Sequence, residues 1–162
     1  MAVNFINFDT KHAVCGSSLL KATHAGHIKN MKVADATLDN GTVVTLGALE
    51  TGTIEVYKQG AGSTTFRALV ESQASNGNYY VKVTAVAGDY LVLQDPLIYE
   101  QHTTQMQHQS NFFNQKDDIV RTYELYVDDV FELSKEGFTG EIAVGDTVQV
   151  DSSTKKLKKV GA

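Results

Sequence analysis

The segment Leu38–Lys58 reads Leu-Asp-Asn-Gly-Thr-Val-Val-Thr-Leu-Gly-Ala-Leu-Glu-Thr-Gly-Thr-Ile-Glu-Val-Tyr-Lys and combines a turn signal with two strand signals. Asn40-Gly41 is typical of a tight hairpin turn of the primed type, because both residue types tolerate the positive φ that such a turn requires. The β-branched residues over 42–46 predict a strand directly after the turn.

The second strand signal covers residues 53–58, where side chains of two kinds alternate. Ile54 and Val56 are expected on one face and Tyr57 on the other, and a period of two fits a strand with one buried face. We therefore expect Ile54 and Val56 to point into the core.

The remainder of the chain repeats this pattern of short strands between turns. Gly60 and Gly62 predict a loop over 59–65, and Gly88-Asp89 predicts a hairpin turn after the strand 79–86. Further strands are expected at 66–71, 90–94, 119–127, 130–133, 140–144, 147–150 and 156–160. Many short strands at close spacing predict a mainly β fold, namely a small β-barrel or β-sandwich of short antiparallel strands.

Two segments far apart in the chain have similar short sequences. Gly-Asp-Thr-Val-Gln-Val at 145–150 echoes Gly-Thr-Val-Val-Thr-Leu at 41–46, and nothing recurs a third time. Because stacked repeats need several copies for stability, we interpret these as two similar turn-strand units. We expect both units in one β-layer that closes the fold from both ends of the sequence.

Two segments lack this strand pattern. Residues 1–30 show neither helical nor strand periodicity, and Phe5, Ile6 and Phe8 are their only dense apolar cluster. These residues fit either a disordered chain end or an extended arm that orders against a neighbouring subunit. We expect an N-terminal arm over 1–30 and a β-rich domain over 31–162.

Residues 100–118 are rich in Gln, His and Asn and predict a long polar surface loop with a helical turn or two.

Composition narrows the classes of partner. The 162 residues suffice for one domain, and the net charge of −5 argues against a protein that tracks nucleic-acid phosphates. Cys15 is the only cysteine, so no internal disulfide framework is expected. Neither a signal peptide nor a membrane-spanning run is recognisable, so we expect assembly in a cytoplasm and no membrane partner.

Catalytic and metal-binding patterns are weak. His24 and His27 are close in sequence, but no Cys or carboxylate cluster at ligand spacing surrounds them. Cys15 would need a base and an orienting group held rigidly before it could act as a nucleophile. Adjacent aspartates such as Asp128-Asp129 are better explained as turn formers. We therefore predict a protein that is not an enzyme and that uses no cofactor and no metal.

The order of these short motifs along the chain is similar to that in a known class of viral proteins. After the 38–58 segment come Asp95-Pro96, Arg-Thr-Tyr-Glu-Leu-Tyr-Val-Asp-Asp-Val-Phe-Glu-Leu over 121–133, and Val-Gly-Asp-Thr-Val-Gln-Val over 144–150. Across about 34–160 the chain resembles head decoration, or cement, proteins of tailed bacteriophages that infect Gram-positive bacteria. The Gln- and His-rich loop departs from that family, which is more charged there.

The resemblance implies a virion structural protein on the capsid exterior, made in the host cytoplasm. Its partners would be the major capsid protein and sister copies, with a homotrimer as one arrangement. Phe5, Ile6 and Phe8 are then the expected capsid-binding residues of the arm, and a truncation beginning after residue 30 is expected to fold but lose capsid binding. Two alternatives stay open: another virion component, such as a tail, neck or fibre-base protein, and a displayed carbohydrate-binding β module.

Overall fold

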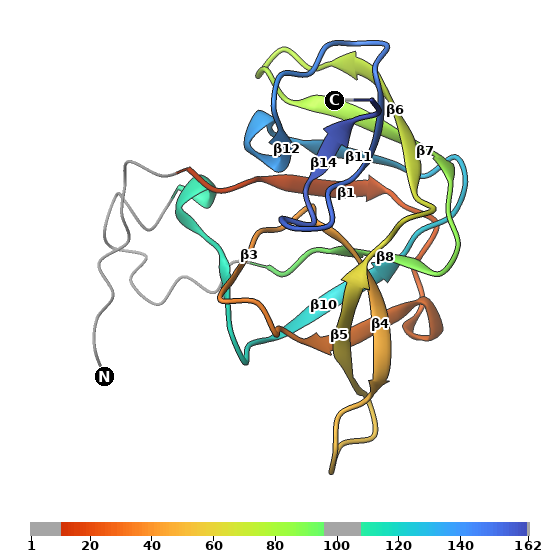
Figure 1. Ribbon diagram of the computed structural model, residues 1–162, viewed down its shortest axis with the longest axis vertical. Coiled ribbons are helices and arrows are strands. Elements are labelled where there is room, and N and C mark those ends of the chain that lie inside the picture. Colours follow the sequence, from red (N-terminus) through yellow and green to blue (C-terminus); the bar gives the residue numbers. More distant parts are fainter. Residues whose placement is uncertain (1–10, 96–107, 162) are drawn as a thin grey trace.

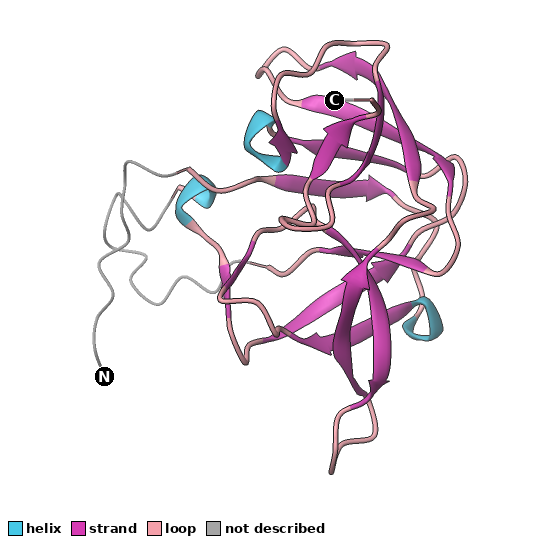
Figure 2. Cartoon of the chain, viewed as in Figure 1, coloured by secondary structure: helices cyan, strands magenta, loops and turns pink. Residues whose placement is uncertain are grey.

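The computed structural model describes residues 11–95 and 108–161. Within these ranges strands are the main regular structure, and turns and loops connect them (Figure 2). The helical content of the same residues is limited to the short 3-10 turns η1 (Ala25–His27), η2 (Gln109–Asn111) and η3 (Lys135–Gly137). The predicted mainly β fold with a small barrel is confirmed.

The strands form an open sheet, a closed barrel and a two-stranded ribbon (Figure 1). The open sheet has seven strands in the order β1 (Cys15–Leu19), β11 (Val130–Leu133), β7 (Tyr79–Ala85), β6 (Arg67–Gln73), β13 (Thr147–Val150), β14 (Leu157–Lys159) and β12 (Phe138–Thr139). The barrel order is β10 (Ile119–Glu124), β2 (Ile28–Lys32), β5 (Val56–Gly62), β4 (Val43–Leu49) and β8 (Asp89–Val92). The ribbon pairs β3 (Thr37–Leu38) with β9 (Asn114–Gln115). Most pairings are antiparallel, but β2–β5 and β12–β14 are parallel.

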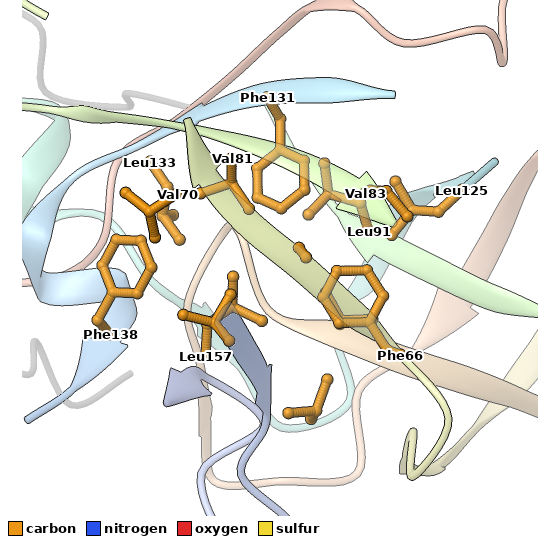
Figure 3. Close-up of a cluster of buried hydrophobic side chains, with 14 of the residues drawn as sticks. Phe66, Val70, Val81, Val83, Leu91, Leu125, Phe131, Leu133, Phe138 and Leu157 are labelled. Carbon is orange, nitrogen blue, oxygen red and sulfur yellow. The ribbon is translucent and has the colours of Figure 1, made fainter. Parts of the chain in front are cut away.

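Two apolar clusters hold these parts together. The larger cluster lies against the open sheet and contains the buried rings of Phe66, Phe131 and Phe138 (Figure 3). It also contains Val43 and Leu91, which are register partners on two barrel strands. The outer face of the barrel therefore packs into the core of the open sheet. A smaller cluster fills the barrel and consists of Met31, Val33, Leu38, Val44, Val92 and Val120.

The two similar turn-strand units do not share a β-layer, so that expectation was wrong. β4 belongs to the barrel, where it pairs with β5 and β8. β13 belongs to the open sheet, where it pairs with β6 and β14. Val43 and Val148, one from each unit, nevertheless lie in the same apolar cluster.

The turn at Asn40-Gly41 exists but does not make a hairpin. Only Gly41 has a positive φ, of 84°, and the turn connects β3 to β4, which belong to different sheets. A Cβ on Gly41 would lie 2.3 Å from Cδ1 of Leu133, so close packing also demands glycine here. The expected hairpin of residues 79–94 is likewise wrong, since β7 lies in the open sheet and β8 in the barrel.

Two glycine-rich segments also differ from prediction. The expected loop at 59–65 is in large part strand, because β5 continues to Gly62. At Gly60 a Cβ would lie 2.4 Å from the carbonyl oxygen of Thr45, so glycine allows β5 to approach β4 closely. The expected strand 140–144 is absent, and only Phe138–Thr139 just before it pairs with β14.

The described part of the expected N-terminal arm belongs to the β body. β1 pairs with β11 and β2 pairs with β10 and β5, while Ala13, Leu20 and Ala22 are buried. The prediction of a separate arm is therefore wrong for residues 11–30, because buried apolar side chains and strand pairing fix them. Residues 1–10 lie outside the described residues. Of the predicted loop, residues 108–118 contain η2, which fits the expected helical turn, and the strand β9, which was not predicted and whose Asn114 is buried.

Candidate interaction site

Residues just before β1 are fastened to two other parts of the chain. Nδ1 of His12 lies 2.7 Å from Oδ1 of Asp39, and the backbone N–H of Ala13 donates to Oδ2 of Asp39 at 3.1 Å. The backbone N–H of His12 donates to the carbonyl of Ser110 at 2.7 Å. The imidazole stacks on Phe113 with ring centroids 4.6 Å apart. We call this set of contacts the N-terminal anchor.

The carboxylate at the centre of the anchor is buried and paired. Asp39 is 4% exposed, and Nζ of Lys156 lies 3.1 Å from its Oδ2. The same ammonium donates to the backbone carbonyl of Glu136 at 2.9 Å. The buried carboxylate of Asp39 thus joins residues 12–13 to Lys156, far along the chain.

A pocket of about 180 Å³ opens beside the anchor. It is lined by residues 13–16 and 93–95, together with Asn40 and Gln109. An apolar cavity of about 150 Å³ is large enough for benzene, so this pocket has room for one aromatic ring. Its lining mixes the apolar side chains of Ala13, Val14 and Leu93 with amides and a carboxylate.

The thiol of Cys15, which lines this pocket, is poorly suited to nucleophilic chemistry. Burial raises its pKa far above the ordinary value, and the nearby carboxylate of Glu132 raises it further. The thiol therefore stays protonated at neutral pH, and the thiolate is the reactive form.

A second polar cluster closes one end of the barrel. Tyr57 is the register partner of the buried Met31, and Tyr90 is the partner of the buried Val44, so both tyrosines point to the barrel interior. Nζ of Lys29 lies 5.1 Å from the ring centroid of Tyr57 and 5.4 Å from that of Tyr90. A hydrogen bond with Tyr90 raises the pKa of Lys29. We call this cluster the barrel mouth.

Further polar side chains line the rim of the barrel mouth. Glu124 is the register partner of Tyr90, and its Oε2 lies 2.9 Å from Nδ1 of His27. The hydroxyl of Tyr126 lies 2.7 Å from the same imidazole nitrogen. Partial burial acts to raise the pKa of Glu124, but the hydrogen bonds of His27 and Tyr126 outweigh it and lower that pKa. Aromatic rings beside a carboxylate and an ammonium offer both stacking and hydrogen bonding to a polar ligand.

Other histidines are placed apart from these clusters. His24 and His108 are exposed, and His102 lies outside the described residues. Across residues 11–95 and 108–161, no group of three or more His, Cys, Asp or Glu is arranged to hold a metal ion. No helix in the described part of the chain is long and apolar enough to cross a membrane.

The residues predicted to bind the capsid, Phe5, Ile6 and Phe8, lie outside the described residues. Sequence reasoning missed the anchor, because no local pattern links His12 to a carboxylate 27 positions away. It also reversed the faces of β5, because Tyr57 points into the barrel, and it placed Ile54 in the strand, although this residue lies in the turn before β5 and is 87% exposed. Comparison with protein-family models, curated proteins and solved structures found no match.

Proposed function

We propose that this chain is a virion structural protein that binds the outer surface of a phage capsid and stabilises contacts between major capsid subunits. The sequence resemblance across 34–160 suggests this role, and the N-terminal anchor is the structural observation that supports it. The anchor fixes residue 12 to Asp39 and Ser110, so whatever precedes it leaves the body from a defined point. Phe5, Ile6 and Phe8 precede that point by four to seven residues.

The geometry sets the reach of the proposed contact. Ten extended residues span at most about 33–36 Å, which is enough to cross onto a neighbouring subunit. Full burial of three large apolar side chains is worth roughly 5–9 kcal/mol. Association costs of roughly 4–15 kcal/mol offset most of this gain, so the arm needs help from contacts made by the β body.

The test is a truncation that begins at Lys11. It removes Phe5, Ile6 and Phe8 but keeps β1 and β2, whereas a truncation after residue 30 removes strands from both the sheet and the barrel and is expected to unfold. We expect the variant that begins at Lys11 to fold, with the same circular dichroism spectrum as the full chain. We also expect it to lose most of its occupancy on purified expanded capsids. Occupancy equal to that of the full chain would remove residues 1–10 from the proposal.

Copy number separates this proposal from a role elsewhere in the virion. Mass spectrometry of purified particles is expected to find the chain in numbers comparable with the major capsid protein. A single ring of copies would instead indicate a tail, neck or fibre-base component.

The barrel mouth favours a second candidate function, a displayed carbohydrate-binding module. Tyr57 and Tyr126, both half-buried, lie there beside Lys29 and Glu124, whereas Tyr90 is buried. Aromatic faces next to hydrogen-bonding groups suit a sugar ring. A glycan array with the purified chain and a Tyr57→Ala variant tests this function, with Tyr80→Ala on the open sheet as the control. Binding lost only in Tyr57→Ala would support it.

A further inference from the structure

The turn of the β4–β5 hairpin, residues 50–55, projects from the barrel as a spike (Figure 1). Burial falls along β4 toward this turn: Val43 and Val44 are fully buried, Leu46 is partly buried, and residues 47–49 are exposed. The first residues of β5, 56–58, still pair with β2, so only the turn stands clear of the barrel strands. Because residues 51–55 are all exposed, the turn contributes little to the core of this chain.

The tip of the spike is ordered by its own hydrogen bonds. The N–H of Glu50 donates to the carbonyl of Val56 at 2.7 Å, and the N–H of Thr53 donates to the carbonyl of Glu50 at 3.2 Å. The hydroxyl of Thr53 also donates to the carbonyl of Glu50, at 2.9 Å. Gly52 has a φ of 81° and no atom near its missing Cβ, so it serves only the turn. This turn is pre-shaped, which lowers the entropic cost of binding a partner.

The side chains displayed at the tip are apolar and acidic. Ile54 is 87% exposed and Leu49 is 45% exposed. Glu55 is exposed next to Ile54, and the segment 47–57 contains two glutamates and no lysine or arginine. Glu50 faces Lys32 at the base of the spike at 3.9 Å, which leaves Glu55 as the acidic group at the end. A complementary partner would offer an apolar depression bordered by basic side chains.

We propose that the β4–β5 tip is the second contact of this protein with the viral shell, inserting Ile54 into an apolar depression flanked by lysine or arginine on a capsid subunit. This inference rests on the proposed capsid-binding function and supplies the body contact that the N-terminal residues need. A second copy of this chain is the less suitable partner. Its pocket beside the anchor carries Asp95 in the lining, which would repel Glu55.

The experiment compares two isoleucines of similar chemistry. Ile54→Ser is tested against Ile119→Ser, which alters an isoleucine that is 57% exposed on β10, two strands from β5 in the barrel order. Both variants should fold, because neither side chain is buried. In co-sedimentation with purified expanded capsids, Ile54→Ser is expected to bind at least about tenfold more weakly than the full chain. Ile119→Ser is expected to bind as the unmodified chain does.

A charge reversal tests the stated chemistry of the partner. Glu55→Lys should weaken capsid binding at low salt and by less at high salt, because screening reduces the effect of an exposed charge. Glu141→Lys, which alters an exposed glutamate in a loop of the open-sheet side, is the matched control and should have no such effect.

The binding results separate failure of the proposed function from failure of the hairpin contact. If the unmodified chain does not bind capsids, both the proposed function and this inference fail. If the unmodified chain binds and Ile54→Ser binds equally well, only the hairpin contact is overturned. Self-association in analytical ultracentrifugation that Ile54→Ser abolishes would show a second copy as the partner and would also overturn the inference.

Discussion

The open sheet and the barrel bury their apolar side chains in different ways. The open sheet is backed by a large cluster with three buried phenylalanines, and it recruits Val43 and Leu91 from the barrel wall. The barrel holds a smaller aliphatic cluster and closes one end with Lys29 between Tyr57 and Tyr90. The open sheet is thus mainly the source of stability. The barrel, which has no free edges, carries the projecting hairpin and the polar mouth.

Matched leucine truncations test this comparison with the largest effect. Leu133 and Leu38 are both fully buried, but Leu133 is enclosed so tightly that a Cβ on Gly137 would lie 2.5 Å from it. We expect Leu133→Ala to reduce the free energy of unfolding by about 4–5 kcal/mol and Leu38→Ala by about 2–3 kcal/mol. Urea denaturation gives both values. Equal losses would show that the barrel core is as important to stability as the core of the open sheet.

Two glycines of similar backbone conformation sharpen the contrast. Gly41 and Gly52 have φ values of 84° and 81°, but only Gly41 faces a neighbour, Leu133. Gly52→Ala is expected to cost about 1 kcal/mol, through backbone strain alone. Gly41→Ala should cost about 3 kcal/mol, because the overpacked core adds to the strain. Thermal unfolding of the two variants measures the difference, and equal shifts in Tm would mean that the structure relaxes around Leu133.

Acid should weaken the open sheet through Asp151, which directly follows β13. Hydrogen bonds from Thr154 and Ser153, with the ammonium of Lys158, hold the pKa of Asp151 at about 2. Because this folded-state pKa is below the unfolded value, the carboxylate stabilises the fold above about pH 4 and loses that effect as the pH falls toward 2. With solvent screening, the contribution is on the order of 1 kcal/mol. Urea denaturation of Asp151→Asn across this range should show a shallower loss of stability; a slope equal to that of the unmodified chain would exclude Asp151 as its cause.

The smallest expected effect concerns the barrel mouth. Replacing Lys29 by Leu removes the cation that lies over Tyr57 and Tyr90. Such contacts are worth roughly 0.5–1 kcal/mol near a surface, so Lys29→Leu should change the free energy of unfolding by no more than this amount. A loss as large as that of Leu38→Ala would mean that the mouth is part of the barrel core. Chemical denaturation under identical conditions makes the two variants comparable.

The sequence predicted local structure well and long-range pairing poorly. The strands expected at 66–71 and 79–86 are present as β6 and β7, which pair with each other. The signal for each of these strands lies within a few neighbouring residues. The assignment of β4 and β13 to different sheets depends instead on partners far away in the chain, which no local pattern specifies.

The candidate sites show the same limit. Alternation over 53–58 indicated a strand, but β5 begins only at Val56, and Ile54 lies in the exposed turn before it. The contact of His12 with Asp39 could not be inferred either, since strand pairing elsewhere brings the two residues together. The sequence shows which chemical groups the chain contains, but the fold determines which of their side chains come into contact.

The placement of β14 has a practical consequence. In Figure 1 the last strand and the chain end that follows it lie on the open-sheet side, far from the tip of the β4–β5 spike. Cargo joined after Gly161, such as an antigen or a fluorescent domain, would point away from whatever the spike touches. On a particle coated with many copies, the fused cargo would therefore form an outer layer without competing for the attachment surface.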